Sequence, residues 1–325
     1  MTAGSMELRV AIVGVGPQAL WWARLLTQCP GTVVSMVASA SAVSDVDGHS
    51  PGPAPDWRHV IRCPDIDVVL VCAPVRHRPE ISIAAMEAGK HVFCDLPMAD
   101  EVDAAKKMVE AAERCGVVLA CRSPDRHRRS IQLVKRWINE GTIGEPMIFR
   151  SRLGREVWNA ASVQCPVEQL AELDSRGVDL ARWFLGSFEE VVGLDVPPPK
   201  DTAVAILKGP GGRVALLESC LRETRGEFSI EVFGRDGYAY AVGMEEDRGG
   251  ERAAFGRRDP TAPFRETVVE FTGENTSRLD EWVSFAEAVR TARPPADSAH
   301  NGIEALGLML TVRESERTGL VVREA

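Results

Sequence analysis

Short apolar runs alternate with helix-like stretches through the N-terminal part of the chain, and this alternation constrains the fold more than any other feature. The apolar runs end at glycine, proline or polar residues, as buried parallel strands do. Strands that alternate with helices predict a doubly wound parallel sheet with helices on both faces. The expected strands cover residues 8–13, 33–37, 68–72, 91–94 and 117–120, and the expected helices cover residues 20–27, 80–88 and 100–115.

The pattern changes near residue 121, after which successive strands are no longer separated by helices. This part is expected to form an α+β domain with a largely antiparallel, open-faced sheet. A charged stretch at 245–259 is expected to be a solvated loop. The sequence therefore predicts two domains, residues 1–121 and 122–325. The expected strands of the second domain cover residues 146–152, 202–207, 213–218, 227–233, 238–242 and 265–271, and its expected helices cover residues 130–140, 172–185, 278–291 and 301–317.

Composition narrows the class of protein. The chain has 325 residues, 45% of them hydrophobic, so it can bury a core and is not a disordered chain. Its 38 Lys and Arg against 47 Asp and Glu leave a net charge of −9, which argues against nonspecific nucleic-acid binding. No apolar run reaches the length of a membrane helix, and the N-terminus lacks the basic start of a signal peptide. The eight cysteines are scattered and form no Cys-x-x-Cys pair, and no two histidines have metal-ligand spacing, so we expect no metal site. Together these features predict a cytoplasmic protein with no membrane segment.

The first expected strand is followed by a motif typical of dinucleotide-binding folds. Gly14-x-Gly16-x-x-Ala19 comes directly after the strand and opens a helix. Gly14 allows a tight turn, and Gly16 lets the backbone approach a pyrophosphate. Pro17 and Gln18 then begin a helix whose free N–H groups attract an anion. A glycine turn needed only for packing is the alternative.

The ends of later strands supply further candidates for cofactor contacts. In such folds an acid usually follows the second strand and binds the ribose hydroxyls of NAD, but this chain has Ser39 there. The missing carboxylate removes repulsion against a 2′-phosphate, so NADP is mildly favoured over NAD. Ala73 and Pro74 end the third strand. His77 after them either reaches the cofactor or is a surface histidine.

Residues 68–97 carry the pattern of a known family. They begin Val-Val-Leu-Val-Cys-Ala-Pro and end Ala-Ala-Met-Glu-Ala-Gly-Lys-His-Val-Phe-Cys-Asp-Leu-Pro. Together with residues 138–146 and 182–186, this pattern resembles the glucose-fructose oxidoreductase/inositol dehydrogenase/MocA (Gfo/Idh/MocA) family, over nearly the whole chain. The resemblance implies an N-terminal Rossmann domain, NAD(P) as cofactor and hydride transfer. It also implies a C-terminal sheet that joins subunits into a homodimer or homotetramer.

The chain departs from the family at positions that the resemblance assigns to the active site. Family members usually carry Glu-Lys-Pro where this chain has Asp95-Leu96-Pro97, and the lysine relays a substrate proton beside the nicotinamide. They also carry an aspartate four residues before a histidine, and Glu172 and Arg176 occupy those positions here. Leucine cannot accept a proton, and arginine stays protonated, so neither replacement is a base.

Three functions follow from this departure. The first hypothesis is an NAD(P)-dependent reductase of a C=N or conjugated C=C bond, because the proton for such a reduction can come from solvent or substrate. The second is a sugar or cyclitol dehydrogenase with a relocated base, Asp174 or Glu172. The third is a catalytically inactive member of the family that serves as a ligand sensor or scaffold.

Arginines near the implied site favour an anionic small-molecule substrate, because guanidinium groups clamp carboxylates and phosphates. Arg176 is the principal candidate among them. The alternative for each arginine is an ion pair with a neighbouring acid, such as Asp125, or Glu172 in the case of Arg176. The candidates for substrate contact are Leu96, Arg122, Arg126, Arg152 and Trp158.

Overall fold

The chain forms two compact units, Met1–Arg122 with Leu279–Leu306 and Ser123–Arg278 with Gly307–Ala325. They are called the N-terminal and C-terminal units below. The boundary expected between residues 121 and 122 stays a prediction, and the return of the late segment to the N-terminal unit was not expected. The structure is a computed structural model that describes residues 7–14, 17–38, 53–54, 56–155, 166–194, 196, 201–221, 226–244, 250–259, 261, 263, 265–295 and 298–324.

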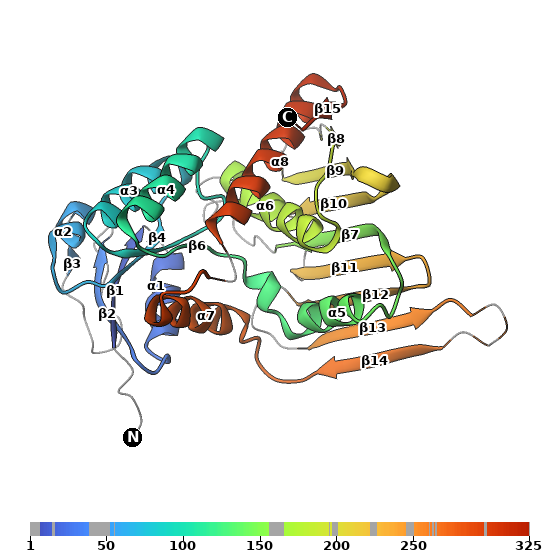
Figure 1. Cartoon of the computed structure of the whole chain (residues 1–325), viewed down its shortest axis with the longest axis horizontal. Coiled ribbons are helices and arrows are strands. Elements are labelled where there is room, and N and C mark those ends of the chain that lie inside the picture. The colour runs from blue at the N-terminus through green and yellow to red at the C-terminus, as the bar shows by residue number, and fades with distance from the viewer. Residues whose placement is uncertain are drawn as a thin grey trace. The chain divides into compact units, whose positions relative to one another are not determined.

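The N-terminal unit contains a six-stranded sheet with the order β3-β2-β1-β4-β5-β6 (Figure 1). All neighbouring strands are parallel, which confirms the doubly wound sheet. The strand order reverses between β1 and β4, and ligands of such sheets bind at the carboxyl ends of the strands at this point. The strands are β1 (Leu8–Gly14), β2 (Thr32–Ala38), β3 (Pro53–Ala54), β4 (Val68–Cys72), β5 (His91–Cys94) and β6 (Leu119–Cys121).

Aromatic side chains fill the core on one side of this sheet. The Phe93 ring of β5 contacts Trp22 of α1, and it also contacts Trp282 and Phe285 of α7. The apolar side chains of alternate β1 residues join the same cluster, because successive residues of a strand point to opposite faces. The helices of the unit are α1 (Pro17–Leu26), α2 (Trp57–Arg62), α3 (Arg78–Glu87) and α4 (Val102–Cys115), together with most of α7 (Ser277–Thr291).

The C-terminal unit contains a nine-stranded sheet with the order β14-β13-β12-β11-β7-β10-β9-β8-β15. Its neighbouring strands are antiparallel except β7 and β10, so the sheet is mixed but largely antiparallel, as expected. The strands are β7 (Pro146–Gly154), β8 (Glu190–Leu194), β9 (Thr202–Lys208), β10 (Val214–Cys220), β11 (Glu227–Gly234), β12 (Gly237–Met244), β13 (Glu251–Arg257), β14 (Glu266–Phe271) and β15 (Val322–Arg323).

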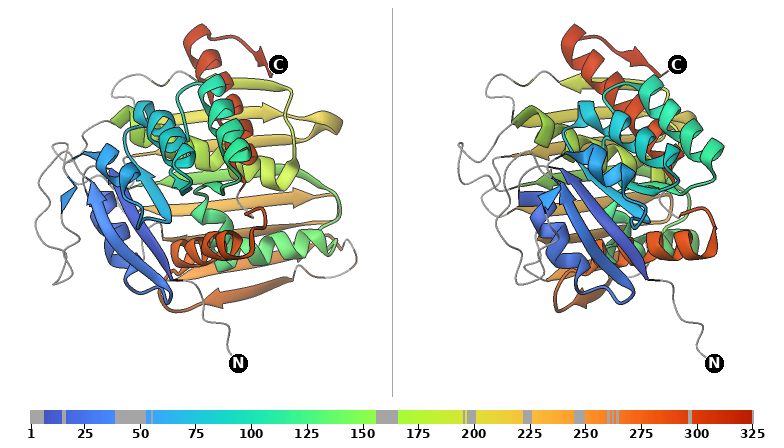
Figure 2. Two further views of the ribbon diagram at one scale, coloured as in Figure 1. Left: turned by 60° about the vertical axis from the view of Figure 1, so that its left-hand side comes forward. Right: turned by 90° about the vertical axis from the view of Figure 1, so that its left-hand side faces the viewer.

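Helices pack on one face of this sheet, and no helix of the described part of the chain covers its other face, which is called the open face below (Figure 2). On the helix-bearing face, Phe149 of β7 stacks on Phe184 of α6. Arg150 and Arg152 of the same strand are exposed on the open face. The helices of this face are α5 (Arg129–Asn139), α6 (Pro166–Leu185) and the later part of α8 (Ala299–Thr318).

The expected loop at 245–259 is wrong over its later part, where the chain forms β13. This strand pairs with β12 and β14 and buries Ala253 and Ala254 completely. The strand could not be recognised in the sequence because its ends are charged and its two buried residues are alanines, which have little β propensity. β8 and β15 were not expected either, since each is short and lies toward an edge of the sheet.

Two glycines of α8 give a matched test of packing. A Cβ on Gly302 would lie 2.8 Å from Cys121 Sγ and 3.1 Å from Met98 Sδ, whereas a Cβ on Gly307 meets nothing within 4 Å. We expect Gly302→Ala to destabilise the protein by about 1–3 kcal/mol through overpacking. Gly307→Ala should stabilise it by about 0.5–1 kcal/mol through helix propensity. Thermal unfolding followed by circular dichroism measures both changes, and equal shifts for the two variants would contradict the packing argument.

Candidate active site

The end of β1 and the start of α1 suit the binding of a phosphate group. β1 ends at Gly14, and α1 begins three residues later with no acidic residue in its first turn. A Cβ on Gly14 would lie 2.7 Å from the backbone oxygen of Cys72, so close packing of β1 against β4 requires glycine here. An anion at the start of α1 therefore meets helix N–H groups and no repelling carboxylate. Gln18 is partly buried in α1, while Gly16, Ser39 and the side chain of Pro17 lie outside the described part of the chain.

The carboxyl end of β4 places its candidate residues at different depths. Ala73 is buried and Pro74 is partly buried. His77 is exposed at the end of a short 3-10 helix (Val75–His77), where its Nε2 accepts a hydrogen bond of 3.1 Å from Arg76 Nε. The structure thus puts His77 at the surface of the N-terminal unit, with another side chain as its hydrogen-bond donor.

Asp95 lies directly after β5 in a buried cluster of charges. Its carboxylate accepts a hydrogen bond from Arg122, whose Nε lies 3.9 Å from Glu281 of α7. Burial by itself lowers the pKa of Arg122, but Asp95 and Glu281 outweigh burial and raise that pKa above its ordinary value. The Arg122 guanidinium also covers the Trp22 ring, 4.7 Å from its centroid. Arg122 therefore binds carboxylates and an aromatic ring of its own unit.

One oxygen of this cluster suits a bound group. Asp95 Oδ2 is buried and has no hydrogen-bond partner among the residues that the structure describes. An unpaired buried carboxylate oxygen is costly unless a donor reaches it, and a ligand or water can supply that donor. Leu96 follows Asp95 and is only 5% exposed, so the next side chain is apolar and closely packed.

In the C-terminal unit, Arg176 of α6 is held by Asp125 of a second 3-10 helix (Pro124–His127). Arg176 Nε donates to Asp125 Oδ2 at 2.6 Å and Arg176 Nη2 donates to Oδ1 at 2.9 Å. Arg128 Nε donates to the same carboxylate at 3.1 Å. Burial by itself raises the pKa of Asp125, but the Arg176 and Arg128 guanidiniums outweigh it and hold that pKa well below its usual range.

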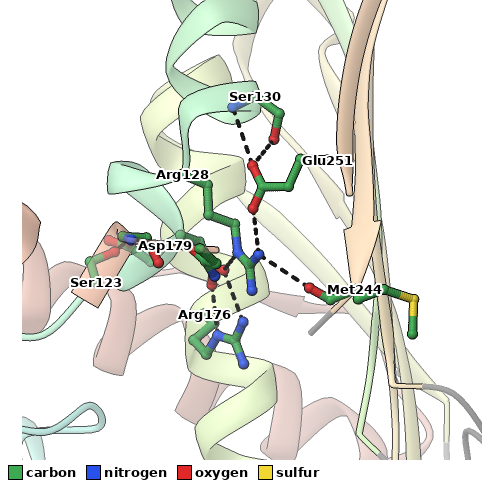
Figure 3. Close-up of polar contacts among 10 residues, drawn as sticks. Ser123, Arg128, Ser130, Arg176, Asp179, Met244 and Glu251 are labelled. Atoms are coloured by element: carbon green, nitrogen blue, oxygen red, sulfur yellow. Dashed lines mark hydrogen bonds and ion pairs between the residues drawn. The ribbon is translucent and has the colours of Figure 1, made fainter. Parts of the chain in front are cut away.

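A second buried ion pair joins the same 3-10 helix to α6. Arg126 Nε donates to Asp179 Oδ2 at 2.8 Å, and Arg126 Nη2 donates to Oδ1 of the same carboxylate. The Ser123 hydroxyl also donates to Asp179 Oδ2 (Figure 3). Arg126 and Arg176 thus bind two different carboxylates of the chain and do not form one shared clamp.

Arg128 extends this network to β12 and β13 (Figure 3). Its Nη1 donates to Glu251 Oε1 at 2.7 Å and to the Met244 carbonyl at 3.3 Å. Glu251 Oε2 accepts a further hydrogen bond of 2.7 Å from the Ser130 hydroxyl. Three buried arginines therefore face two buried carboxylates and the partly buried Glu251, so these charges balance and do not by themselves attract an anion.

Asp174 of α6 has a pKa that is raised to about 7. Burial is the main cause, and Glu316 raises the pKa further; a hydrogen bond with Ser219 and the charge of Arg313 lower it in part. These partners belong to β10 and α8, so Asp174 faces a different side of α6 from Arg176. A carboxyl group with a pKa near neutral can exchange a proton at physiological pH.

The remaining candidates are not brought together with Arg176. Arg152 lies on the open face of the sheet, 3.7 Å from Glu218, whereas Arg176 belongs to a helix on the opposite face. Trp158 and the side chain of Glu172 lie outside the described part of the chain. An ion pair between Glu172 and Arg176 is therefore untested, and the structure gives Arg176 a different carboxylate.

Sequence reasoning did not single out Glu281, and it treated Asp125 only as a nearby acid. Glu281 is distant in sequence from Arg122, so no spacing rule links them. Asp125 had a local signal, since it is the one acid in the basic stretch 122–129. A lone acid within a run of arginines favours a shared carboxylate over separate solvated charges.

Two comparisons with protein families decide the family of this chain. Residues 8–123 match the model described as "Oxidoreductase family, NAD-binding Rossmann fold". Residues 131–240 match the C-terminal domain model of the same family, GFO/IDH/MocA. The chain belongs to the Gfo/Idh/MocA family of oxidoreductases. As a member it is an NAD(P)-dependent oxidoreductase, and the Rossmann fold of its N-terminal unit is the cofactor-binding part.

Relatives of the chain include named dehydrogenases. It is 26% identical over 284 residues to myo-inositol 2-dehydrogenase of Thermotoga maritima, and the match covers 80% of each chain. It is 32% identical over 147 residues to levoglucosan dehydrogenase of Pseudarthrobacter phenanthrenivorans, covering 42% of this chain and 37% of the relative. A solved levoglucosan dehydrogenase in complex with NADH and levoglucosan superposes with a TM-score of 0.81 at 21% identity, over 98% of this chain and 99% of that one. This last likeness shows the fold.

The described residues contain neither a metal-binding cluster nor a membrane-spanning helix. No three His, Cys, Asp or Glu side chains in this part of the chain come close enough together to hold a metal ion. None of the described helices is both long and apolar enough to cross a membrane. The cytoplasmic location expected from the sequence stays a prediction.

Proposed function

We propose that the chain reduces a C=N or conjugated C=C bond of a small molecule. NAD(P)H, when bound, supplies the hydride. The observation that supports this function is Leu96, a buried apolar side chain at the position where the resemblance places a proton-relaying lysine. Reduction of an iminium ion needs no proton from the protein, because the nitrogen is already protonated and hydride addition to carbon completes the amine.

The residues at the β1–β4 switch point fit this cofactor. The first turn of α1 offers N–H groups without a competing acid, and Asp95 has an unpaired oxygen at the carboxyl edge of the same sheet. The choice between NADP and NAD depends on Ser39, which lies outside the described residues, so it stays a prediction. Energy transfer from the seven tryptophans to bound NADPH or NADH measures the preference directly.

The charge of the substrate is a separate proposal. Arg126 and Arg176 already bind Asp179 and Asp125, so they do not by themselves support an anionic substrate. We propose that the substrate is an anion, and that groups other than these two guanidiniums recognise its negative charge. Cyclic imines with and without a carboxylate, compared in one assay, show whether the negative charge raises kcat/KM.

A dehydrogenase of a sugar or cyclitol is the second candidate, and the pKa of Asp174 favours it. A carboxyl group with a pKa of about 7 is a competent base for a hydroxyl proton. Relatives named as inositol and levoglucosan dehydrogenases point the same way. Reduction of NAD(P)+ by myo-inositol or levoglucosan, lost in Asp174→Asn, would establish this function in place of the first.

Leu96→Lys tests the proposed reductase. We expect it to lower kcat/KM for iminium reduction at least tenfold, because a buried ammonium group repels the cationic substrate and disturbs the packing of this site. Leu96→Met preserves side-chain volume and is the control that should stay near the wild type. Oxidation of NAD(P)H followed at 340 nm measures both. A gain of imine reduction in the lysine variant, or no imine reduction by the wild type, would overturn the proposal.

We also propose that the open face of the nine-stranded sheet binds a second copy of the chain. One row across this face runs through Ile206, Leu216, Arg150, Glu231 and Tyr240, which are paired from strand to strand. Ile206 and Leu216 are 39% and 38% exposed, and charges of both signs follow them. A face with adjacent apolar and oppositely charged positions can complement a copy of itself.

Sedimentation velocity tests this association. We expect the wild type to sediment as a dimer or tetramer, and the double variant with Ile206→Glu and Leu216→Glu to sediment as a monomer, because buried carboxylates oppose the contact. Val283→Glu replaces an apolar residue of α7 that is 51% exposed and should leave the oligomer intact. A monomeric wild type at micromolar concentration would refute the proposal.

A further inference from the structure

Arg78, the first residue of α3, binds three backbone carbonyls at the carboxyl edge of the N-terminal sheet. Its Nε donates to the Ala73 oxygen at 2.8 Å, at the end of β4. Its Nη1 donates to the Pro97 oxygen at 2.6 Å and to the Asp95 oxygen at 3.2 Å, in the segment after β5. The side chain is only 12% exposed, so these bonds are shielded from water.

Two of these carbonyls flank Leu96, the residue on which the proposed function depends. The Asp95 and Pro97 oxygens belong to the residues immediately before and after Leu96. Arg78 Nη2 also lies 4.0 Å from Asp95 Oδ2, the carboxylate oxygen that has no hydrogen-bond partner. One guanidinium thus holds the backbone on both sides of Leu96 and faces the unpaired oxygen beside it.

The strand order indicates which half of the dinucleotide lies near Arg78. In a doubly wound sheet the pyrophosphate lies at the start of the first helix, and the end of β2 binds the adenosine ribose. The dinucleotide crosses the switch point, so β4 and β5 are left for its nicotinamide half. Arg78 joins the ends of those two strands.

We propose that Arg78 is a positioning residue for the nicotinamide half of the cofactor site. It sets the spacing between the end of β4 and the Asp95–Pro97 segment, and so fixes the backbone that carries Leu96. The planar fork of arginine is suited to this task, because it directs several N–H groups at fixed angles to separate acceptors. Lysine keeps the charge but has no fork and cannot hold the same three carbonyls in the same geometry. The inference rests on the proposed function for the role of Leu96. The place of Arg78 beside the nicotinamide half follows from the NAD(P) site.

The test compares the binding of NADH with that of ADP-ribose, which lacks the nicotinamide ring. We expect Arg78→Gln to raise the Kd of NADH at least tenfold and to leave the Kd of ADP-ribose within twofold of the wild type. Arg78→Lys should give a smaller loss with the same selectivity. Arg114→Gln is the matched control. Arg114 is exposed on α4, and its guanidinium forms an ion pair with the exposed Glu87.

A purely structural role predicts a different result. If Arg78 only stabilises the fold, its variants lower the melting temperature and lower the binding of both ligands equally, which would overturn the proposal. Equal NADH binding by the wild type and Arg78→Gln would also overturn it. If Arg78→Gln does not fold, Arg78→Lys decides by the same ratio of dissociation constants. Failure of the wild type to bind NADH at all would instead refute the cofactor site itself.

Discussion

Replacing Asp125 with alanine is expected to destabilise the C-terminal unit by about 3–5 kcal/mol. The substitution leaves the Arg176 and Arg128 guanidiniums buried without the carboxylate that both of them bind. A buried guanidinium that loses such a carboxylate costs more than the original pair contributed, because less of its lost hydration is offset. For a unit of this size the loss corresponds to a decrease of roughly 6–20 °C in Tm.

Hydrogen exchange locates this effect within the molecule. We expect faster exchange in α5 and α6, which flank the network, while the sheet of the N-terminal unit keeps its protection. Glu314→Gln removes an exposed carboxylate of α8 that pairs with Arg317 and should change stability by less than about 0.5 kcal/mol. A loss below about 1 kcal/mol in Asp125→Ala would show that the two arginines find other partners.

The pKa of Asp125 adds a pH dependence to the same prediction. Because the folded pKa lies well below its usual range, the stabilisation is complete above the unfolded value of about 4. It is lost as the pH falls further, toward the folded pKa. Asp125→Asn should therefore make the stability of the C-terminal unit less sensitive to acid than it is in the wild type.

Asp174→Asn is expected to stabilise the protein at pH 8 by up to about 4 kcal/mol and to change little near pH 4. Burial raises the folded pKa of Asp174 to about 7, so folding favours the protonated form. The group is neutral in both folded and unfolded states below the unfolded pKa of about 4. As the pH rises from there to 7, the unfolded state loses its proton first, and stability decreases. Asparagine stays neutral at every pH and can keep the hydrogen bond with Ser219.

Thermal unfolding at pH 4.5, 6 and 8 measures this difference. Glu270→Gln on β14 removes an exposed carboxylate and should give parallel curves for variant and wild type. If Asp174→Asn lowers Tm at pH 8, the carboxylate form is required by the fold and the raised pKa is wrong. The same variant separates the two proposed functions, because imine reduction should survive it and alcohol oxidation through Asp174 should not.

The N-terminal fold could be predicted because its central strands are buried on both faces. Val68 to Cys72 is apolar at every position, and such a run has few alternatives to a central parallel strand. β13 shows the opposite case, because its buried residues are two alanines between charged ends. The parallel pairing of β7 with β10 could not be predicted either, since the segment between them contains α6, β8 and β9.

The candidate site was less predictable for a related reason. The resemblance to the family placed Arg176 at a histidine position of the implied site, but its partner Asp125 is 51 residues away and belongs to another element. Local spacing suggested Glu172, four residues before it on the same helix. Contacts between distant elements depend on the tertiary fold, and one sequence contains no direct record of them.

The aromatic core of the N-terminal unit has a consequence for the order of events on the ribosome. Trp22 and Phe93 are synthesised first, and Trp282 and Phe285, which complete their packing, follow only after strands β7 to β14 of the C-terminal sheet have been synthesised. At ordinary translation rates the delay between residues 122 and 282 is on the order of ten seconds. During that time part of one apolar face of the nascent Rossmann sheet stays uncovered, so the cofactor domain is unfinished until α7 has been synthesised.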